Sequence, residues 1–186
     1  MPYDPDQPSP PSPADYGAMV CRIAGGWGTR LVFEPGRLIV GNAGVLLSRV
    51  IRVKPGVTDP FVIVDAAMND LMRPALYDAW HRIEAVRPTG ARHSANVVGP
   101  VCETGDTFAT GRQMDEVSAD DLVVFRTAGA YAAAMSSTYN SRPLTPEVLV
   151  DGKRWALVRP RVDVDALIAA DRIPDWLSGC VGPPSS

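Results

Sequence analysis

The stretch LIVGNAGVLLSRVIRVKPGVTDPFVIV (residues 38–64) decides the fold class of this chain. It contains three short apolar runs rich in β-branched residues, at 38–40, 45–53 and 61–64. The tripeptide Lys-Pro-Gly at 54–56 closes the second run as a turn. Short runs of this kind between turn signals are typical of strands, so we expect a mainly β domain from about residue 38.

The same pattern continues along the rest of the chain. Residues 97–98 and 122–125 are further strand candidates. Residues 148–158 contain Asp-Gly between two apolar runs, which predicts a β-hairpin. Residues 128–135, AGAYAAAM, are consistent with either a strand of small residues or a short helix.

Helical patterns are few and short. Residues 14–23 precede a Gly-Gly pair and predict one helix, and residues 164–170 predict another. Between residues 65 and 85 the apolar period changes, and Leu76, Trp80 and Ile83 predict an amphipathic helix that starts near Pro74.

These patterns divide the chain into four parts. Residues 1–13 carry six prolines and predict an extended connector. Residues 14–37 combine the first helix with a short strand at 31–33. Residues 38–175 form the β-rich domain, and residues 176–186 are expected to be a flexible tail.

Composition excludes several classes of protein. Of the 186 residues, 46% are hydrophobic and 21% charged, which is a globular composition rather than a disordered one. A net charge of −3 gives no electrostatic reason to expect nucleic-acid or membrane binding. Three widely spaced cysteines and two histidines predict neither a disulfide framework nor a metal site. No secretory signal or apolar run of about 18 residues is present, so we expect a cytoplasmic protein.

Two loops contain residue types suited to chemistry. Glu34-Pro35-Gly36-Arg37 follows an apolar run, where a glycine allows close backbone approach to a phosphate and an arginine binds anions. The loop CETGD at 102–106 places a thiol beside a carboxylate, which is a candidate acid/base pair. Taken singly, the first loop is better explained as a plain turn, and the second as a packed cysteine beside a surface acid.

Three further residues are candidates for ligand binding. Arg73 and Tyr77 are four residues apart, so they share one face of the expected helix. Tyr131 lies in the Gly-Ala-Tyr segment. Each also has a plain structural explanation, as a solvated helix residue or a core aromatic.

Taken together and in order, these motifs resemble the C-terminal part of the diaminopimelate decarboxylases. These are pyridoxal-phosphate enzymes of the alanine-racemase-like class, in the Orn/DAP/Arg decarboxylase family. The matching stretches are FEPGRLIVGNAG (33–44), VDAAMNDLMRPALYDAWH (64–81), GPVCETGDTFA (99–109) and AGAYAAAMSSTYNSRP (128–143). The resemblance implies an α+β, mainly β chain. It would hold an antiparallel β-barrel or sandwich-like domain, preceded at 14–37 by a βα remnant of a (β/α)₈ barrel.

The resemblance also implies roles for individual residues. The pyridoxal 5'-phosphate contacts would be Glu34, Pro35, Gly36, Arg37 and Tyr131. The substrate contacts would be Arg37, Arg73, Tyr77, Glu103 and Tyr131. Cys102 would be the catalytic acid, and its loop would enter the active site of the other subunit of a homodimer.

The front half of the family is not matched. Its Schiff-base lysine lies in an early barrel strand, whereas the only lysines here, Lys54 and Lys153, lie in Lys-Pro-Gly and Asp-Gly-Lys-Arg turns. We therefore expect a fragment that is inactive alone, without the lysine and the phosphate-binding glycines.

The resemblance implies decarboxylation of meso-2,6-diaminopimelate to L-lysine, and the residue chemistry is consistent with it. A distal carboxylate suits Arg37 and Arg73, and a distal ammonium suits Glu103. Three alternatives stay open: a decarboxylase of ornithine or arginine, a non-catalytic module that pairs with a full-length subunit, and a truncated product without function.

Overall fold

The computed structural model describes residues 8–178, and the chain divides between Ser136 and Ser137 into two compact units. The first unit contains helices α1 (Pro13–Ala24), α2 (Gly36–Val40) and α3 (Arg73–Tyr77), and the 3₁₀ helices η1 (Gly41–Ala43) and η2 (Ala133–Met135). Its strands are β1 (Leu46–Lys54), β2 (Phe61–Val64), β3 (Ile83–Ala85), β4 (Arg92–Val98), β5 (Thr107–Asp115) and β6 (Leu122–Phe125).

The six strands of the first unit form one sheet in the order β3-β6-β1-β2-β4-β5. Neighbours are antiparallel except β2 and β4, which run parallel. Strand β1 is shared: residues 46–49 pair with β6, and residues 50–54 pair with β2. Because β1 pairs with one strand along its first half and with another along its second half, the sheet changes direction at β1 and curls.

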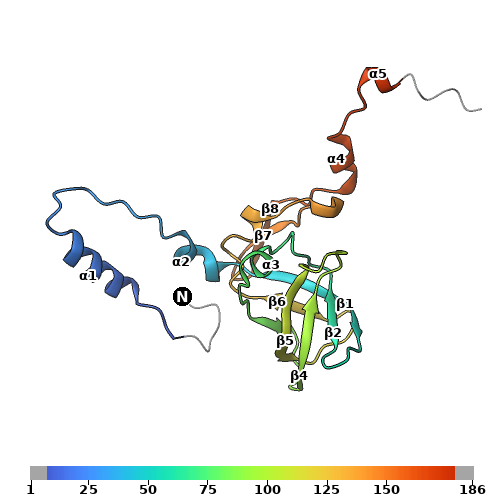
Figure 1. Ribbon diagram of the computed structural model, residues 1–186, viewed down its shortest axis with the longest axis horizontal. Helices are drawn as coiled ribbons and strands as arrows, with labels where there is room; N and C mark the ends of the chain where they lie inside the picture. Colours follow the sequence, from blue (N-terminus) through green and yellow to red (C-terminus); the bar gives the residue numbers. More distant parts are fainter. Residues whose placement is uncertain (1–7, 179–186) are drawn as a thin grey trace, which may run out of the picture. The chain divides into compact units, whose positions relative to one another are not determined.

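The curl brings the two edge strands of the sheet together. The backbone N–H of Ala85 on β3 donates a hydrogen bond of 3.0 Å to the Asp115 carboxylate on β5. The sheet is thus a nearly closed barrel (Figure 1), and the order of the strands places its seam between β3 and β5. Its core consists of fully buried apolar side chains from all the long strands, among them Val50, Val62, Val64, Val97, Met114, Val123 and Phe125.

The second unit consists of short elements. Strands β7 (Glu147–Asp151) and β8 (Arg154–Arg159) pair as an antiparallel hairpin, joined through the turn at Gly152. The 3₁₀ helix η3 (Tyr139–Ser141) precedes the hairpin, and helices α4 (Val164–Ala169) and α5 (Asp175–Ser178) follow it.

Most of the expected elements are confirmed. The mainly β fold class is correct, and the strands expected at 45–53, 61–64 and 122–125 correspond to β1, β2 and β6. The helix expected at 14–23 is α1, in which Ser12 and Asp15 cap each other reciprocally. The Asp-Gly hairpin and the helix near residue 164 are also present.

Three expectations before residue 86 are wrong. Residues 31–33 form no strand, and residues 38–40 belong to helix α2. The helix expected from Pro74 onward is only five residues long, because Asp78 adopts a left-handed conformation (φ 51°) that ends it. Trp80 therefore lies outside any helix, and Ile83 begins strand β3.

Other segments were underpredicted or undecided. The sequence pattern does not predict strand β5 or most of β4, because their apolar residues are small or widely spaced. The undecided segment 128–135 is neither strand nor α-helix; it makes turns and ends in η2. Residues 175–178 of the expected tail region are helical, and residues 179–186 lie outside the described part of the chain. The domain boundaries given above stay predictions.

Within residues 8–178, every helix is too short or too polar to cross a lipid bilayer.

The packing of the barrel core makes a stability prediction. Phe125 is fully buried and its ring lies 4.7 Å from the Phe108 ring, whereas Phe61 on β2 is 38% exposed. Phe125→Ala should lower the free energy of unfolding by about 3–5 kcal/mol, because it leaves a cavity. Phe61→Ala is the matched control and should cost clearly less. Chemical denaturation measures both, and equal losses would contradict the assignment of the core.

Candidate functional site

An arginine held between two tyrosines is the centre of the candidate site. The guanidinium carbon of Arg73 lies 5.5 Å from the centroid of the Tyr77 ring and 5.2 Å from the centroid of the Tyr131 ring. Arg73 and Tyr77 are at opposite ends of α3, one turn apart, as their spacing predicts. Tyr131 comes from a distant loop, so the fold brings together three of the residues singled out in the sequence. We call this group the arginine clamp.

Helix α3 is fixed by the loop that precedes it. The hydroxyl of buried Ser48 on β1 donates to the Asp65 carboxylate at 2.6 Å and accepts the N–H of Ala66 at 2.9 Å. The Asp70 carboxylate accepts the N–H of Ala67 at 2.9 Å. These bonds hold the backbone of the loop against the barrel, so the first turn of α3, which carries Arg73, starts from a rigid support.

Tyr131 is held in place by a close backbone contact. The N–H groups of Ala128 and Gly129 donate to the carbonyls of Gly44 and Gly41, at 2.9 and 3.0 Å. A Cβ on Gly129 would lie 1.9 Å from the carbonyl oxygen of Val40, so no residue other than glycine fits there. Tyr131 itself has a positive φ of 64°, a strained conformation that this anchored loop imposes.

The same contact positions the segment that carries Arg37. Helix α2 and η1 place Arg37 a few residues before the carbonyls that hold the Tyr131 loop. In the preceding turn, the N–H of Gly36 donates to the carbonyl of Glu34 at 2.9 Å. Both Gly36 and Glu34 are exposed, and a Cβ on Gly36 would meet nothing within 4 Å, so this backbone is open to a ligand.

A buried histidine connects the parts of the site. His81 is 1% exposed, and its Nδ1–H donates to the carbonyl of Arg126 at 2.9 Å. Burial lowers the pKa of His81, and the positive charges of Arg73, Arg112 and Arg37 lower it further. His81 is therefore neutral near pH 7, and its bond joins the chain after α3 to the end of β6, from which the Tyr131 loop starts.

Cys102 and Glu103 lie on a loop shaped by one buried carboxylate. Asp106, 2% exposed, accepts the N–H of Val101 at 2.7 Å and the N–H of Met68 at 2.6 Å. A Cβ on Gly99 would lie 2.2 Å from that carboxylate, so the approach requires glycine. Asp106 thus ties the Cys102 loop to the loop before α3.

This arrangement places the Cys102 loop beside α3. Thr104 and Gly105 line the same depression, of about 340 Å³, as Pro74 and Ala75 of the helix. Cys102 is an exposed free thiol and Glu103 is exposed too. An exposed thiol next to a carboxylate on a rigid loop is suited to act on a molecule outside this chain's own core.

The residues present fit an anionic ligand better than they fit covalent attachment of an aldehyde. The positive charges of Arg37 and Arg73 both lower the pKa of His81. A Cβ on Gly36 would meet no atom within 4 Å, so a ligand has room to approach the backbone there. The two lysines lie outside these segments of the chain: Lys54 ends strand β1, and Lys153 lies in the turn of the β7–β8 hairpin. The residues of these segments therefore suit contacts to carboxylates or phosphates, and neither lysine belongs to these segments.

Comparison with known proteins decides the family. The family described as pyridoxal-dependent decarboxylase, C-terminal sheet domain, matches residues 3–129. This chain belongs to that family. The resemblance seen in the four sequence motifs is confirmed.

The relatives of this decarboxylase-family chain include diaminopimelate decarboxylases. The protein of that name from Zymomonas mobilis is 55% identical over 175 residues, which cover 94% of this chain and 42% of the relative. One from Neisseria meningitidis is 51% identical over 155 residues, 83% of this chain and 38% of the relative. A crystal structure of diaminopimelate decarboxylase from M. jannaschii in co-complex with L-lysine matches with a TM-score of 0.84 at 33% identity, over 95% of this chain and 42% of that one. The chain spans about 40% of the length of the curated relatives it matches.

The sequence patterns do not identify the residues that hold the segments of the site in place. His81, Asp106 and Gly129 were not singled out, although each fixes a segment that carries a predicted site residue. A signal was present for Asp106, since the carboxylate in CETGD follows a glycine turn. His81 and Gly129 act through contacts with residues that are distant in the sequence, so no local sequence pattern indicates their roles.

The buried histidine predicts a pH dependence of stability. The folded-state pKa of His81 lies below the ordinary value of 6.5. As the pH falls below 6.5, the unfolded chain therefore takes up a proton at this histidine that the folded chain does not bind. The melting temperature should therefore fall on acidification through this range. The limiting slope for one proton is about 1.4 kcal/mol per pH unit.

Two variants test the assignment. His81→Phe should flatten this part of the pH profile whatever its effect on stability at pH 8. His93→Gln, which removes the other histidine, should leave the slope in place. An unchanged slope in His81→Phe would show that other groups cause it.

Proposed function

We propose that this chain is the substrate-recognition and proton-donating portion of a diaminopimelate decarboxylase. The reaction would remove CO₂ from one end of meso-2,6-diaminopimelate and place a proton on the same carbon, giving L-lysine. The observation that carries the proposal is the arginine clamp, which presents a guanidinium group fixed by two aromatic rings. The names of the relatives, and the L-lysine bound to the M. jannaschii protein, support the same substrate class.

The clamp suits recognition of a carboxylate at the distal end of the substrate. A guanidinium is planar and offers paired N–H donors, which match the two oxygens of a carboxylate. Contacts with Tyr77 and Tyr131 restrict the rotamers of Arg73, so less conformational entropy is lost on binding. Arg37, whose charge reaches the same histidine, adds positive potential to the region.

Cys102 and Glu103 suit the remaining steps. A thiol held at the reacting carbon can donate the proton that replaces CO₂, and a carboxylate can hold the substrate's distal ammonium. Both groups are exposed on their loop, which is consistent with their serving the active site of a second subunit. The working protein would therefore be a homodimer, or a pairing of this chain with a full-length subunit, in the cytoplasm.

The cofactor would contact this chain at two places. Pyridoxal phosphate, when bound, supplies the electron sink that accepts the electron pair of the bond to CO₂. The open backbone at Glu34, Pro35, Gly36 and Arg37 would face its phosphate side, and the exposed ring of Tyr131 would contact both cofactor and substrate. This chain's residues would orient the substrate and protonate it, and the covalent lysine would come from the barrel portion of the protein.

A decarboxylase of ornithine or arginine is the second candidate. Its substrates have no distal carboxylate, so two arginines at the distal end would repel the substrate's own positive charge. The position of the arginine clamp therefore favours diaminopimelate.

Substitution of the clamp arginine tests the substrate. In an active full-length protein that contains this segment, Arg73→Leu should lower kcat/KM for diaminopimelate about tenfold or more, because it removes a charged hydrogen-bond donor. Inhibition by lysine, which lacks the distal carboxylate, should change far less. Arg52→Leu, an exposed arginine on β1, is the control and should leave both constants unchanged. Equal, small effects on the two ligands would remove Arg73 from the site.

Substitution of the thiol tests the proton donor. Cys102→Ala in the same protein should reduce turnover by about 10²–10⁴-fold. The melting temperature should not change, because the thiol is exposed. Cys21→Ala, at an exposed cysteine on α1, is the matched control. A variant that lost stability and kept its specific activity would show that Cys102 is a structural residue.

A further inference from the structure

A single buried carboxylate links two segments to which the proposed function gives different tasks. Asp106 is 2% exposed, and its two oxygens bond to different parts of the chain. Oδ2 accepts the N–H of Val101, the residue before Cys102, at 2.7 Å. Oδ1 accepts the N–H of Met68, in the loop before α3, at 2.6 Å. One side chain therefore joins the loop of the proposed proton donor to the loop that leads to the arginine clamp.

The Cys102 loop also closes on the main chain of Asp106. The N–H of Gly99 donates to the carbonyl of Asp106 at 2.9 Å, and the N–H of Asp106 donates to the carbonyl of Glu103 at 3.0 Å. Within this turn, the N–H of Glu103 donates to the carbonyl of Val101 at 2.8 Å. The backbone on both sides of Cys102 is thus bonded, although its thiol is exposed. The position of the thiol therefore depends on where Asp106 holds this turn.

The loop on the other side of the link is itself fixed. The N–H of Ala67 donates to the Asp70 carboxylate at 2.9 Å, and the N–H of Asp70 donates to the carbonyl of Ala67 at 2.8 Å. Leu71, which is fully buried, continues this turn toward α3. Met68 lies inside the turn, so its N–H has a fixed position from which it holds Asp106.

The space around the carboxylate fits its shape. A Cβ on Gly99 would overlap with both oxygens of Asp106, so glycine is required at that position. Both oxygens act as acceptors. A carboxylate can do this and an amide cannot, because one end of an amide carries N–H groups. The surroundings therefore require a carboxylate, and an amide of the same size would lose one of the two bonds.

We propose that Asp106 is a positioning residue for the reaction, which holds Cys102 in place by tying its loop to the loop before α3. This inference rests on the proposed function, in which Cys102 protonates the substrate carbon. A proton donor must lie within hydrogen-bond reach of the atom that it protonates, and a displacement of about 1 Å costs up to about 10²-fold in rate. Asp106 touches neither substrate nor cofactor and acts through the backbone of the Cys102 loop.

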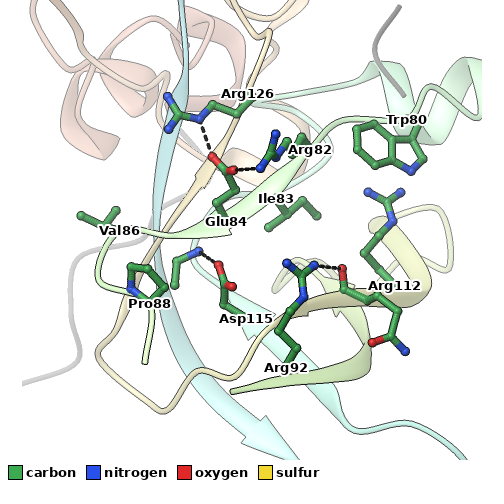
Figure 2. Close-up of a pocket in the computed structure, with 12 residues that line it drawn as sticks. Trp80, Arg82, Ile83, Glu84, Val86, Pro88, Arg92, Arg112, Asp115 and Arg126 are labelled. Atoms are coloured by element: carbon green, nitrogen blue, oxygen red, sulfur yellow. Dashed lines mark hydrogen bonds and ion pairs between the residues drawn. The ribbon is translucent and has the colours of Figure 1, made fainter. Parts of the chain in front are cut away.

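Amide hydrogen exchange of the 186-residue chain tests the link without a catalytic assay. Asp106→Asn keeps the size of the side chain and removes one acceptor, so the amide of Val101 or of Met68 should exchange about tenfold faster or more. The amide of Ala85 is the internal control and should not change, because it donates to Asp115 at the seam between β3 and β5 (Figure 2). Equal acceleration of all three amides, or of none, would overturn the proposal.

A double-mutant cycle in the active full-length protein tests whether Asp106 acts through Cys102. At saturating diaminopimelate, Asp106→Asn should lower kcat about 10–100-fold. Asp115→Asn, the same change at the far end of β5, is the matched control and should leave kcat near its starting value. In the Cys102→Ala background, Asp106→Asn should have almost no further effect, because both changes impair the same proton transfer. Losses that multiply would contradict the positioning role.

The single variants separate this inference from the proposed function. If Cys102→Ala keeps full turnover, the proposed function fails and the positioning role fails with it. If Cys102→Ala lowers turnover and Asp106→Asn does not, only the positioning role fails. If Asp106→Asn does not fold, Gly99→Ala, whose Cβ would displace the carboxylate, should give the same results in both experiments.

Discussion

Strand β1 is the constraint on which the rest of the structure depends. Its first half pairs with β6 and its second half with β2, and the change of partner occurs at Val50, which is fully buried. The N–H of Val50 donates to the carbonyl of Asp121, and its own carbonyl accepts the N–H of Asp120. One long strand therefore belongs to two parts of the sheet, one formed with β6 and one formed with β2. The two parts lie at an angle to each other because the partner changes at Val50, and this change makes the sheet curl.

The curl has a direct consequence for the site. It places β6 next to β3, so that the chain after α3 and the chain after β6 run side by side and His81 can bond to the carbonyl of Arg126. The loop that leaves β6 then docks through Gly129 on the segment 40–44 that enters β1. Arg73, Tyr77 and Tyr131 lie together because these backbone contacts bring their segments together.

The sequence predicted those features that depend on local chemistry. Strands β1, β2 and β6 have apolar runs rich in β-branched residues, and Arg73 and Tyr77 share a helical face by spacing alone. Features set by distant contacts were mispredicted or missed. Residues 38–40 are apolar and β-branched, yet they are helical in the structure, where the carbonyl of Val40 approaches Gly129. Strand β5 forms because β4 pairs with it, despite the positive φ of Gly111 within it.

Arginines occur in two different settings in this barrel, one beside α3 and one at the seam between β3 and β5. On the side of α3, the Arg73 guanidinium lies against two tyrosine rings, and the neutral, buried His81 lies in the same region. At the seam, Arg82 and Arg126 are paired with Glu84 and hold the edge strand, which is a structural use of the same residue type. Arg112 belongs to both regions, since it bonds to the carbonyl of His81 and lines the pocket beside Asp115 at the seam between β3 and β5. Arg112 therefore links the seam between β3 and β5 to the chain that follows α3, and one side chain contributes to both regions.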